Sequence, residues 1–385
     1  MPESGSSLRT VTLLAFKLGC TAFGGPAAHI AMLRQDVVEK RRWLSDQRFL
    51  DLIGITNLIP GPNSTEMVMH IGKERAGNRG LVAAGAAFIL PAALITLIFA
   101  WLYMEYGTTT QGAWVLRGIK PVVLAVVVQA IWNLGRTAFR TVPLAIVGAI
   151  VFALYLFGIN EILLLFGGAI VVFLGTRLAA SGKRPSTSSF IAPILTPGAF
   201  MAQAAADPSI PYTGLRLFLT FLKIGSVLYG SGYVLVAFIH NDFVERLGWL
   251  TETQLLDAVA VGQFTPGPVF TTATFVGYVV GGFTGAVVAT LGIFLPAFIF
   301  VAVAHSLMNR LMALPWVRSL LDGVNVAAIG LMAAVAVVLA RDAVVNVLTA
   351  LLFVVAFILL IRFRVNSALL VAAGALVSIV WELAA

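Results

Sequence analysis

Two Pro-Gly-Pro triplets interrupt otherwise apolar sequence, at Pro60-Gly61-Pro62 and Pro266-Gly267-Pro268. Each proline lacks the backbone N–H that a helix needs and clashes with the preceding turn, and the glycine adds backbone freedom. Neither triplet can therefore lie inside a regular helix. Two broken elements at matching places in two apolar halves of a chain are typical of the binding site of a transporter.

The composition indicates a membrane protein. The chain is 59% hydrophobic and 11% charged, too few charges for the surface of a soluble domain of this size. Apolar runs of membrane-spanning length recur from end to end, so we predict an all-α polytopic protein. The alternating segments of a β-barrel are absent. We expect no removable signal peptide, because Met1 to Ser7 has neither a basic region nor a small-residue cleavage site.

The second half of the chain repeats the first. Lys17-Leu18-Gly19 matches Lys223-Ile224-Gly225 at an offset of 206 residues, and the two triplets share this offset. Beyond the triplets the offset falls to 205, where Leu90-Pro91-Ala92 matches Leu295-Pro296-Ala297. A register kept over about eighty residues is a strong sign of an internal repeat.

A polar stretch separates the two repeats. Ser181 to Ser189 is rich in serine and basic residues, as expected of a flexible linker. We predict an N-terminal repeat over 1–180, a polar linker over 181–213 and a C-terminal repeat over 214–385.

Basic residues predict the orientation of the repeats. In the first half, the loops after the first segment and after the broken element contain Arg34, Lys40, Arg41, Arg42, Arg48, Lys73, Arg75 and Arg79. The equivalent loops, 241–253 and 278–284, contain only Arg246. Because basic loops stay in the cytoplasm, equivalent loops should lie on opposite sides of the membrane, and we predict inverted-topology repeats.

Each repeat is then expected to contain about five transmembrane helices and one re-entrant hairpin with a Pro-Gly-Pro tip. An alternative stays open at the break formed by Gly24-Gly25-Pro26. If the first segment folds back there, the amino terminus moves to the cytoplasmic side and the linker must supply a crossing. Glycines such as Gly72 and Gly80 suit close helix packing around the hairpins.

These motifs resemble those of the chromate transporter family in its long, two-repeat form. The segments that carry the resemblance are Phe23 to Ile30, Pro60 to Glu66, Gly80 to Pro91, Gly230 to Tyr233, Gln263 to Thr272 and Gly277-Tyr278. The resemblance implies a multi-pass protein of the cell membrane that exports chromate and thereby gives chromate resistance. It also implies that the proton motive force drives export, and that sulfate is a close mimic of the substrate.

A tetrahedral dianion in a low-dielectric site needs hydrogen-bond donors on several sides and compensating positive charge. We expect a helix to restart after Pro62, so that the free N–H groups and positive dipole end at Asn63, Ser64 and Thr65 face the oxyanion. Alternatively, Ser64 and Thr65 only cap their helix. The remaining expected contacts lie in the second tip and at the glycine breaks: Thr271, Thr272, Gly24, Gly25 and Gly230.

Positive charge could come from Lys17, Lys223 and His29. The two lysines occupy equivalent places inside apolar segments, where an ionisable group suggests a function, although a lysine can also extend to the membrane surface. His29 could bind the anion when protonated or relay protons. Its alternative role is that of a packing histidine held by a hydrogen bond.

Glu66 is the predicted proton carrier, together with His29. It lies one turn past the first tip, where a carboxyl that is protonated from outside and deprotonated inside could couple proton entry to anion exit. Alternatively, Glu66 stays ionised and stabilises the helix start.

Other classes of function fit less well. An integral membrane enzyme would need a nucleophile, a metal or paired acids, and the isolated Cys20 and four histidines suggest neither catalysis nor a metal site or cofactor. A passive anion channel stays open, since two tips that meet at the midplane can also line a pore. We expect chromate or sulfate, protons and the lipid bilayer as partners, no nucleic acid, and a chain compatible with a homodimer.

Overall fold

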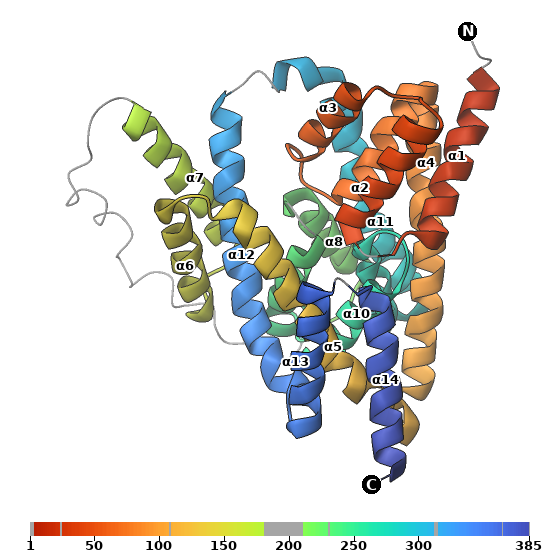
Figure 1. The fold of residues 1–385 in the computed structure, drawn as a ribbon, viewed down its shortest axis with the longest axis vertical. Helices are drawn as coiled ribbons and strands as arrows, with labels where there is room; N and C mark the ends of the chain where they lie inside the picture. The colour runs from red at the N-terminus through yellow and green to blue at the C-terminus, as the bar shows by residue number, and fades with distance from the viewer. Residues whose placement is uncertain are drawn as a thin grey trace.

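The computed structural model describes residues 4–23, 25–107, 109–180, 211–229, 232–311, 315–363 and 365–384. Every regular element in these ranges is helical, which confirms the predicted all-α class. Six of their helices are long and apolar enough to cross a membrane, and the protein is a polytopic membrane protein (Figure 1).

The first half of the chain forms seven α-helices and one π-helical turn. In chain order they are α1 Ser4–Thr21, α2 Gly25–Arg34, η1 Gln35–Lys40, α3 Asp46–Thr56, α4 Asn63–Tyr106, α5 Thr110–Ala138, α6 Val142–Leu156 and α7 Glu161–Ala180. The second half gives α8 Gly214–Val227, η2 Gly232–Val234, α9 Leu235–Ile239, η3 His240–Arg246, α10 Glu252–Phe264, η4 Val269–Thr271, α11 Thr272–Leu311, α12 Pro315–Ala343, α13 Val347–Arg362 and α14 Ser367–Ala384.

The two halves carry the same backbone irregularity at equivalent places. α4 reverses direction at Ala76 and Gly77, whose φ angles are −144° and 62°. α11 reverses at Gly281 and Gly282, whose φ angles are −140° and 61°. These kinks lie 205 residues apart, as the sequence register requires beyond the triplets. A positive φ is open to glycine without steric cost, which explains the glycine at the second position of each kink.

The first segment of each repeat folds back instead of crossing the membrane. The Ser7 hydroxyl donates to the Arg75 carbonyl over 2.6 Å, and the Arg75 guanidinium lies 4.9 Å from the centre of the Trp43 ring. Residues 7 and 43 therefore meet at one end of the molecule, which we call the Arg75 end. In the second repeat Tyr212 and Trp249 meet in the same way, with ring centroids 5.5 Å apart; we call this the Trp249 end.

The described residues contain fewer helices of membrane-spanning length than the five or so that the sequence predicts for each repeat. The break after α1, where Gly25 has a φ of 76°, turns the segment back on itself. Among the described residues, three helices of each half are long and apolar enough to cross a membrane: α4, α5 and α7 in the first half, and α11, α12 and α14 in the second. α6 and α13 are shorter apolar helices. Each half also contains two broken hairpins, the folded-back first segment and the one with the Pro-Gly-Pro tip.

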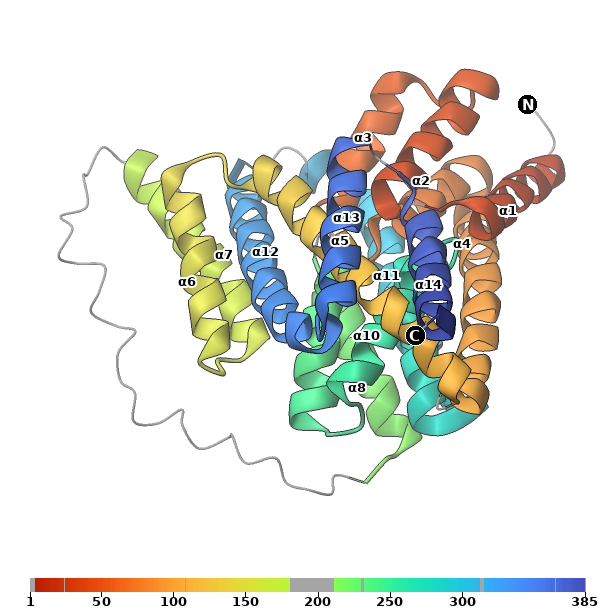
Figure 2. The same ribbon diagram turned by 60° about the horizontal axis from the view of Figure 1, so that its bottom comes forward.

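Helices of the two repeats interleave. α12 packs against α6 and α7, α5 packs against α13 and α14, and α4 packs against α11. Figures 1 and 2 both show α6, α7 and α12 on one side of the molecule and α1 with α4 on the other. The hydrophobic core is therefore shared between the repeats and does not belong to either one.

Within each kinked helix the two arms pack at backbone distance. A Cβ atom on Gly72 would lie 2.8 Å from the Cβ of Ala84, and one on Gly277 would lie 2.6 Å from the Cβ of Ala289. Gly72 also faces the carbonyl of Gly80 across the kink. These glycines let the outgoing arm of each hairpin lie directly on the following membrane-crossing arm.

We predict that Gly72→Ala destabilises the fold, because the added methyl group overlaps the Gly80 backbone. The expected loss is about 1–3 kcal/mol, typical of an overpacked site. Thermal unfolding of the purified protein in detergent measures it. Gly167→Ala is the control, since a Cβ atom at Gly167 meets nothing within 4 Å. Equal unfolding temperatures for the two variants would contradict this account of the hairpin.

Candidate functional site

Each Pro-Gly-Pro tip is held by the opposite repeat. The Gly61 N–H donates to the Leu228 carbonyl over 2.8 Å, and the Gly267 N–H donates to the Ala22 carbonyl over 2.9 Å. Ala22 and Leu228 are themselves equivalent, since both end the first helix of their repeat. The glycines have φ angles of 140° and 90°, which favour glycine at both tips. The two repeats therefore exchange their tips at the centre of the protein.

The tips also pack against the crossing arms of α4 and α11. A Cβ atom on Gly267 would lie 2.8 Å from that of Ala92 in α4, and one on Gly61 would lie 3.6 Å from that of Ala297 in α11. Ala92 and Ala297 again occupy equivalent positions. Small residues on these arms thus leave room for the backbone of each tip.

The first tip presents free hydrogen-bond donors. α4 begins at Asn63, as predicted, and its N-cap Pro62 supplies no side-chain cap. The N–H of Glu66 donates to the Pro62 carbonyl over 3.0 Å, so the three N–H groups before it have no carbonyl within the helix. The buried Thr65 hydroxyl has no hydrogen-bond partner among the described residues. These groups can receive an anion at the positive end of the helix.

The second tip uses its hydroxyl groups locally. The Thr271 hydroxyl donates to the Pro268 carbonyl over 2.9 Å and accepts from Thr96 over 3.2 Å. The Thr272 hydroxyl donates to the Val269 carbonyl over 2.8 Å. Both side chains are buried beside the tip, but their protons are already engaged.

The two predicted cationic lysines lie in different surroundings. Lys17 is exposed on α1, next to the exposed Phe16. Lys223 donates to Asp242 over 2.6 Å and lies 3.9 Å from Glu161, two carboxylates that are fully buried. The charge of Lys223, whose side chain is 31% exposed, is therefore offset by these two carboxylates. Among the described residues, neither lysine side chain has a hydrogen bond or ion pair with a tip.

His29 lies at the second tip. Its Nε2 atom is 3.0 Å from the Ala22 carbonyl, the same oxygen that accepts from Gly267. The ring packs edge-on against Phe88, and its Nδ1 atom has no partner in the described part of the chain. Of the predicted glycines, Gly25 begins α2, whereas Gly24 and Gly230 lie outside the described residues.

Glu66 is fully buried beside the first tip. A Cβ atom on Gly61 would overlap its Oε1 atom, so the carboxyl folds back against the tip. Within the described residues neither of its oxygens has a hydrogen-bond partner. A carboxyl group without partners in such a place is costly to ionise, and it stands where an anion bound to the first turn of α4 would stand.

Comparison with known proteins identifies the family. The family model described as "Chromate transporter" matches residues 9–173 and again residues 215–379, a shift of 206 residues at both ends. The chain belongs to the chromate transporter family. This confirms the resemblance found in the sequence and the presence of two repeats.

Named relatives of this chromate transporter family member agree. A "Chromate transport protein" of Cupriavidus metallidurans is 30% identical over 371 residues, covering 96% of this chain and 92% of the relative. A protein of the same name from Pseudomonas aeruginosa is 34% identical over 334 residues, covering 84% and 79%. A "Probable chromate transport protein" of Synechococcus elongatus is 31% identical over 361 residues, covering 91% and 89%. No solved structure matches the chain.

Sequence reasoning missed three polar residues of this transporter. Gln263, just before the second tip, is buried, and its Nε2 atom lacks a partner in the described ranges. His70 and His305 join α4 to α11, with their Nδ1 atoms 3.0 Å apart. The spacing of His70 four residues after Glu66 was visible in the sequence, but its partner lies 235 residues away.

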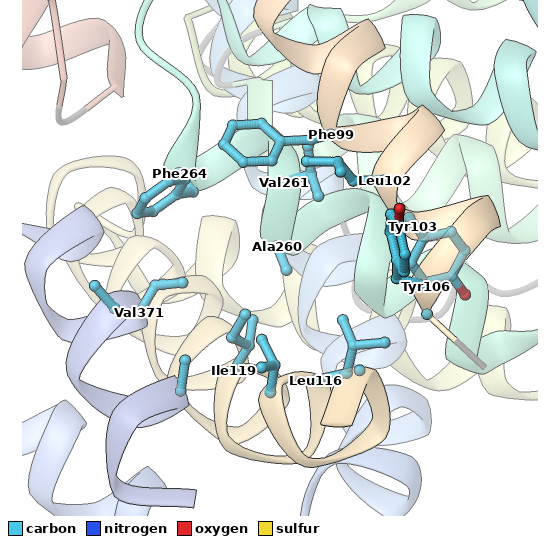
Figure 3. A pocket seen from close by; sticks show the side chains of 15 residues that line it. Phe99, Leu102, Tyr103, Tyr106, Leu116, Ile119, Ala260, Val261, Phe264 and Val371 are labelled. Atoms are coloured by element: carbon cyan, nitrogen blue, oxygen red, sulfur yellow. The ribbon is translucent and has the colours of Figure 1, made fainter. Parts of the chain in front are cut away.

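A cavity of about 350 Å³ lies between α4, α5, α10 and α14 (Figure 3). Its walls are apolar and include Phe99, Ile119, Phe264 and Val371, and none of the predicted site residues lines it. Desolvating a dianion against such walls would be unfavourable. The lining of this cavity therefore does not suit an oxyanion.

One cluster of side chains in the described residues could in principle bind a metal ion, although the sequence predicts no metal site. Ligand atoms of His240, Glu245 and Glu252 lie within 4.8 Å of one another. The ring of His240 already bonds Glu252 over 2.8 Å and Tyr155 over 3.0 Å. Both ring nitrogens of His240 are thus engaged by other side chains.

We predict that Lys223→Met destabilises the transporter, whereas Lys17→Met does not. The first change leaves Asp242 and Glu161 buried with less compensating charge, at an expected cost of about 3 kcal/mol. The second alters an exposed side chain, with an expected effect below about 0.5 kcal/mol. Thermal unfolding in detergent measures both. A Lys223→Met protein that unfolds like wild type but no longer binds chromate would instead assign Lys223 to the substrate.

Proposed function

We propose that the protein exports chromate from the cytoplasm across the cell membrane in exchange for protons, and thereby gives resistance to chromate. The observation that carries the proposal is the first turn of α4, where free N–H groups and the Thr65 hydroxyl adjoin the buried Glu66. The names of the relatives support chromate as the substrate.

We propose further that the repeats lie in the membrane with opposite orientation. The first repeat begins at the Arg75 end and the second at the Trp249 end. The Tyr103 hydroxyl, near the far end of α4, donates over 3.0 Å to Asp257 of α10, the helix that follows Trp249. The Arg75 end and the Trp249 end thus lie at opposite ends of the crossing arm of α4. The basic Arg75 end faces the cytoplasm.

Glu66 couples the movement of protons to that of chromate because its ionised carboxylate and the oxyanion compete for the first turn of α4. An ionised carboxylate and a dianion at the first turn of α4 repel each other strongly in a medium of low dielectric constant. The anion therefore binds when Glu66 is protonated. When Glu66 loses its proton toward the cytoplasm, the carboxylate takes the N–H groups and displaces the anion outward.

Sulfate is expected to compete with chromate. The N–H and hydroxyl donors at the first tip bind only the oxygen atoms of the substrate. Chromate and sulfate are both tetrahedral dianions that present such oxygen atoms. Discrimination between them then depends on size and not on a different set of hydrogen bonds.

We predict that Glu66→Gln abolishes the dependence of transport on a pH gradient. In everted membrane vesicles, wild type should accumulate chromate when the gradient is imposed, and Glu66→Gln should bind chromate without accumulating it. Glu105→Gln is the control, since Glu105 is an exposed acid on the same helix. Uptake by wild type that ignores the gradient would overturn proton coupling and favour a passive anion channel.

We also predict that Thr65→Val weakens chromate binding without lowering stability. A hydrogen bond to a charged group contributes about 1.5–3 kcal/mol, so the dissociation constant should rise about tenfold or more. Titration of the purified protein with chromate measures it. Thr56→Val is the control, because the buried Thr56 hydroxyl donates to the Ile53 carbonyl over 2.9 Å within α3. Equal affinities in both variants would exclude Thr65 from the site.

A further inference from the structure

A buried pair of histidines joins the two central helices. His70 of α4 and His305 of α11 lie with their Nδ1 atoms 3.0 Å apart and their rings stacked at 26°, with centroids separated by 5.2 Å. His70 is fully buried, and the side chain of His305 is 15% exposed. One ring must donate its N–H and the other must accept, so the tautomers of the two rings are coupled.

The pair lies between two acids on the same helix. Glu66, His70 and Glu74 follow one another at intervals of four residues, which places them on one face of α4. The Nε2 atom of His305 is 3.8 Å from Glu74, whose side chain is 23% exposed. Glu66, His70, His305 and Glu74 thus form a column of polar side chains. It leads from the first tip, through the buried pair, to a partly exposed carboxylate at the Arg75 end.

Three side-chain atoms of the column are unpaired in the described part of the chain. They are the two carboxyl oxygens of Glu66 and the Nε2 atom of His70, which have no hydrogen-bond partner among the described residues. These are the atoms that a proton passing from Glu66 to His70 would use. Glu66 and His70 lie one helical turn apart on α4. The relay needs a side-chain rotation or one water molecule to join them.

The column is confined to one repeat. At the equivalent positions, 205 residues away, Phe275 replaces His70, Val279 replaces Glu74 and Ala100 replaces His305. Packing of the hairpin against the crossing arm therefore needs none of these polar groups, since the second repeat makes the same hairpin with apolar ones.

We propose that His70 and His305 conduct protons between Glu66 and the cytoplasm, by a route that the oxyanion does not use. The proposal rests on the proposed function. The relay adds to that function a separate route for the proton, so that the proton enters while the anion leaves.

The proton moves along the column in successive transfers between neighbouring side chains. Protonated Glu66 gives its proton to Nε2 of His70, and the Nδ1–H of His70 passes its proton to Nδ1 of His305. His305 releases the proton on its Nε2 to the Glu74 carboxylate, which gives it to water. Glu66 ends ionised, both rings stay neutral with exchanged tautomers, and one proton has reached the cytoplasmic side.

The surrounding charges suit transfer through neutral rings. Lys73 donates to the Ala302 carbonyl over 2.7 Å beside the pair, and Arg48 pairs with Glu74. These two cations disfavour a lasting positive charge on either ring.

The test uses the whole protein reconstituted in liposomes and two assays. The first measures net chromate transport driven by a pH gradient. The second measures exchange of labelled for unlabelled chromate at equal pH, which needs no net proton transfer. The variants are His70→Gln and His305→Gln, with Ser306→Ala as a matched control next to the pair.

Both histidine variants should lose at least about a hundredfold in gradient-driven transport, the lower end of the usual contribution of a proton-transfer group. Their exchange rates, and both rates of Ser306→Ala, should stay within about twofold of wild type. Gradient-driven transport at the wild-type rate in both histidine variants would overturn the relay. Loss of both activities together would also overturn it, because the pair would then be structural. Failure of proton coupling itself would appear separately, in wild type.

Discussion

The structure depends on two exchanged backbone hydrogen bonds, from Gly61 to Leu228 and from Gly267 to Ala22. A broken helix in a membrane leaves backbone groups that water cannot satisfy, and each must find a partner inside the protein. Here the break in one repeat's first segment supplies the carbonyl for the other repeat's tip. The repeats are therefore locked together where both are irregular, and the start of α4 is left at the centre of the protein.

On this nearly symmetric frame the chemistry is one-sided. The kinks, tips and helix caps recur in both halves, but Glu66, His70 and Glu74 have apolar or uncharged counterparts in the second half. A symmetric frame allows the two sides of the membrane to be exposed in turn. In the proposed exchange, an acid on only one repeat takes up and releases the proton at a single place.

The buried charges of the protein divide into two kinds. Asp242 pairs with Lys223 and with Arg246 over 2.9 Å, so its charge is compensated where it stands. Glu161 lies 3.9 Å from Lys223 and has a partial counter-charge. Glu66 has no such partner among the described residues. Compensated carboxylates hold elements in place, whereas the proposed coupling role needs a buried acid without a fixed counter-charge.

The sequence by itself determined the helical class, the repeat, the two tips and the helix start at Asn63, because hydrophobicity, proline chemistry and capping are local. It also named Glu66 as the acid at the tip. Only the tertiary structure decided that the first segments fold back, that Lys17 is exposed while Lys223 is paired, and that His70 meets His305. Each of these outcomes depends on contacts between residues far apart in the chain, and local sequence patterns carry no information about such pairings.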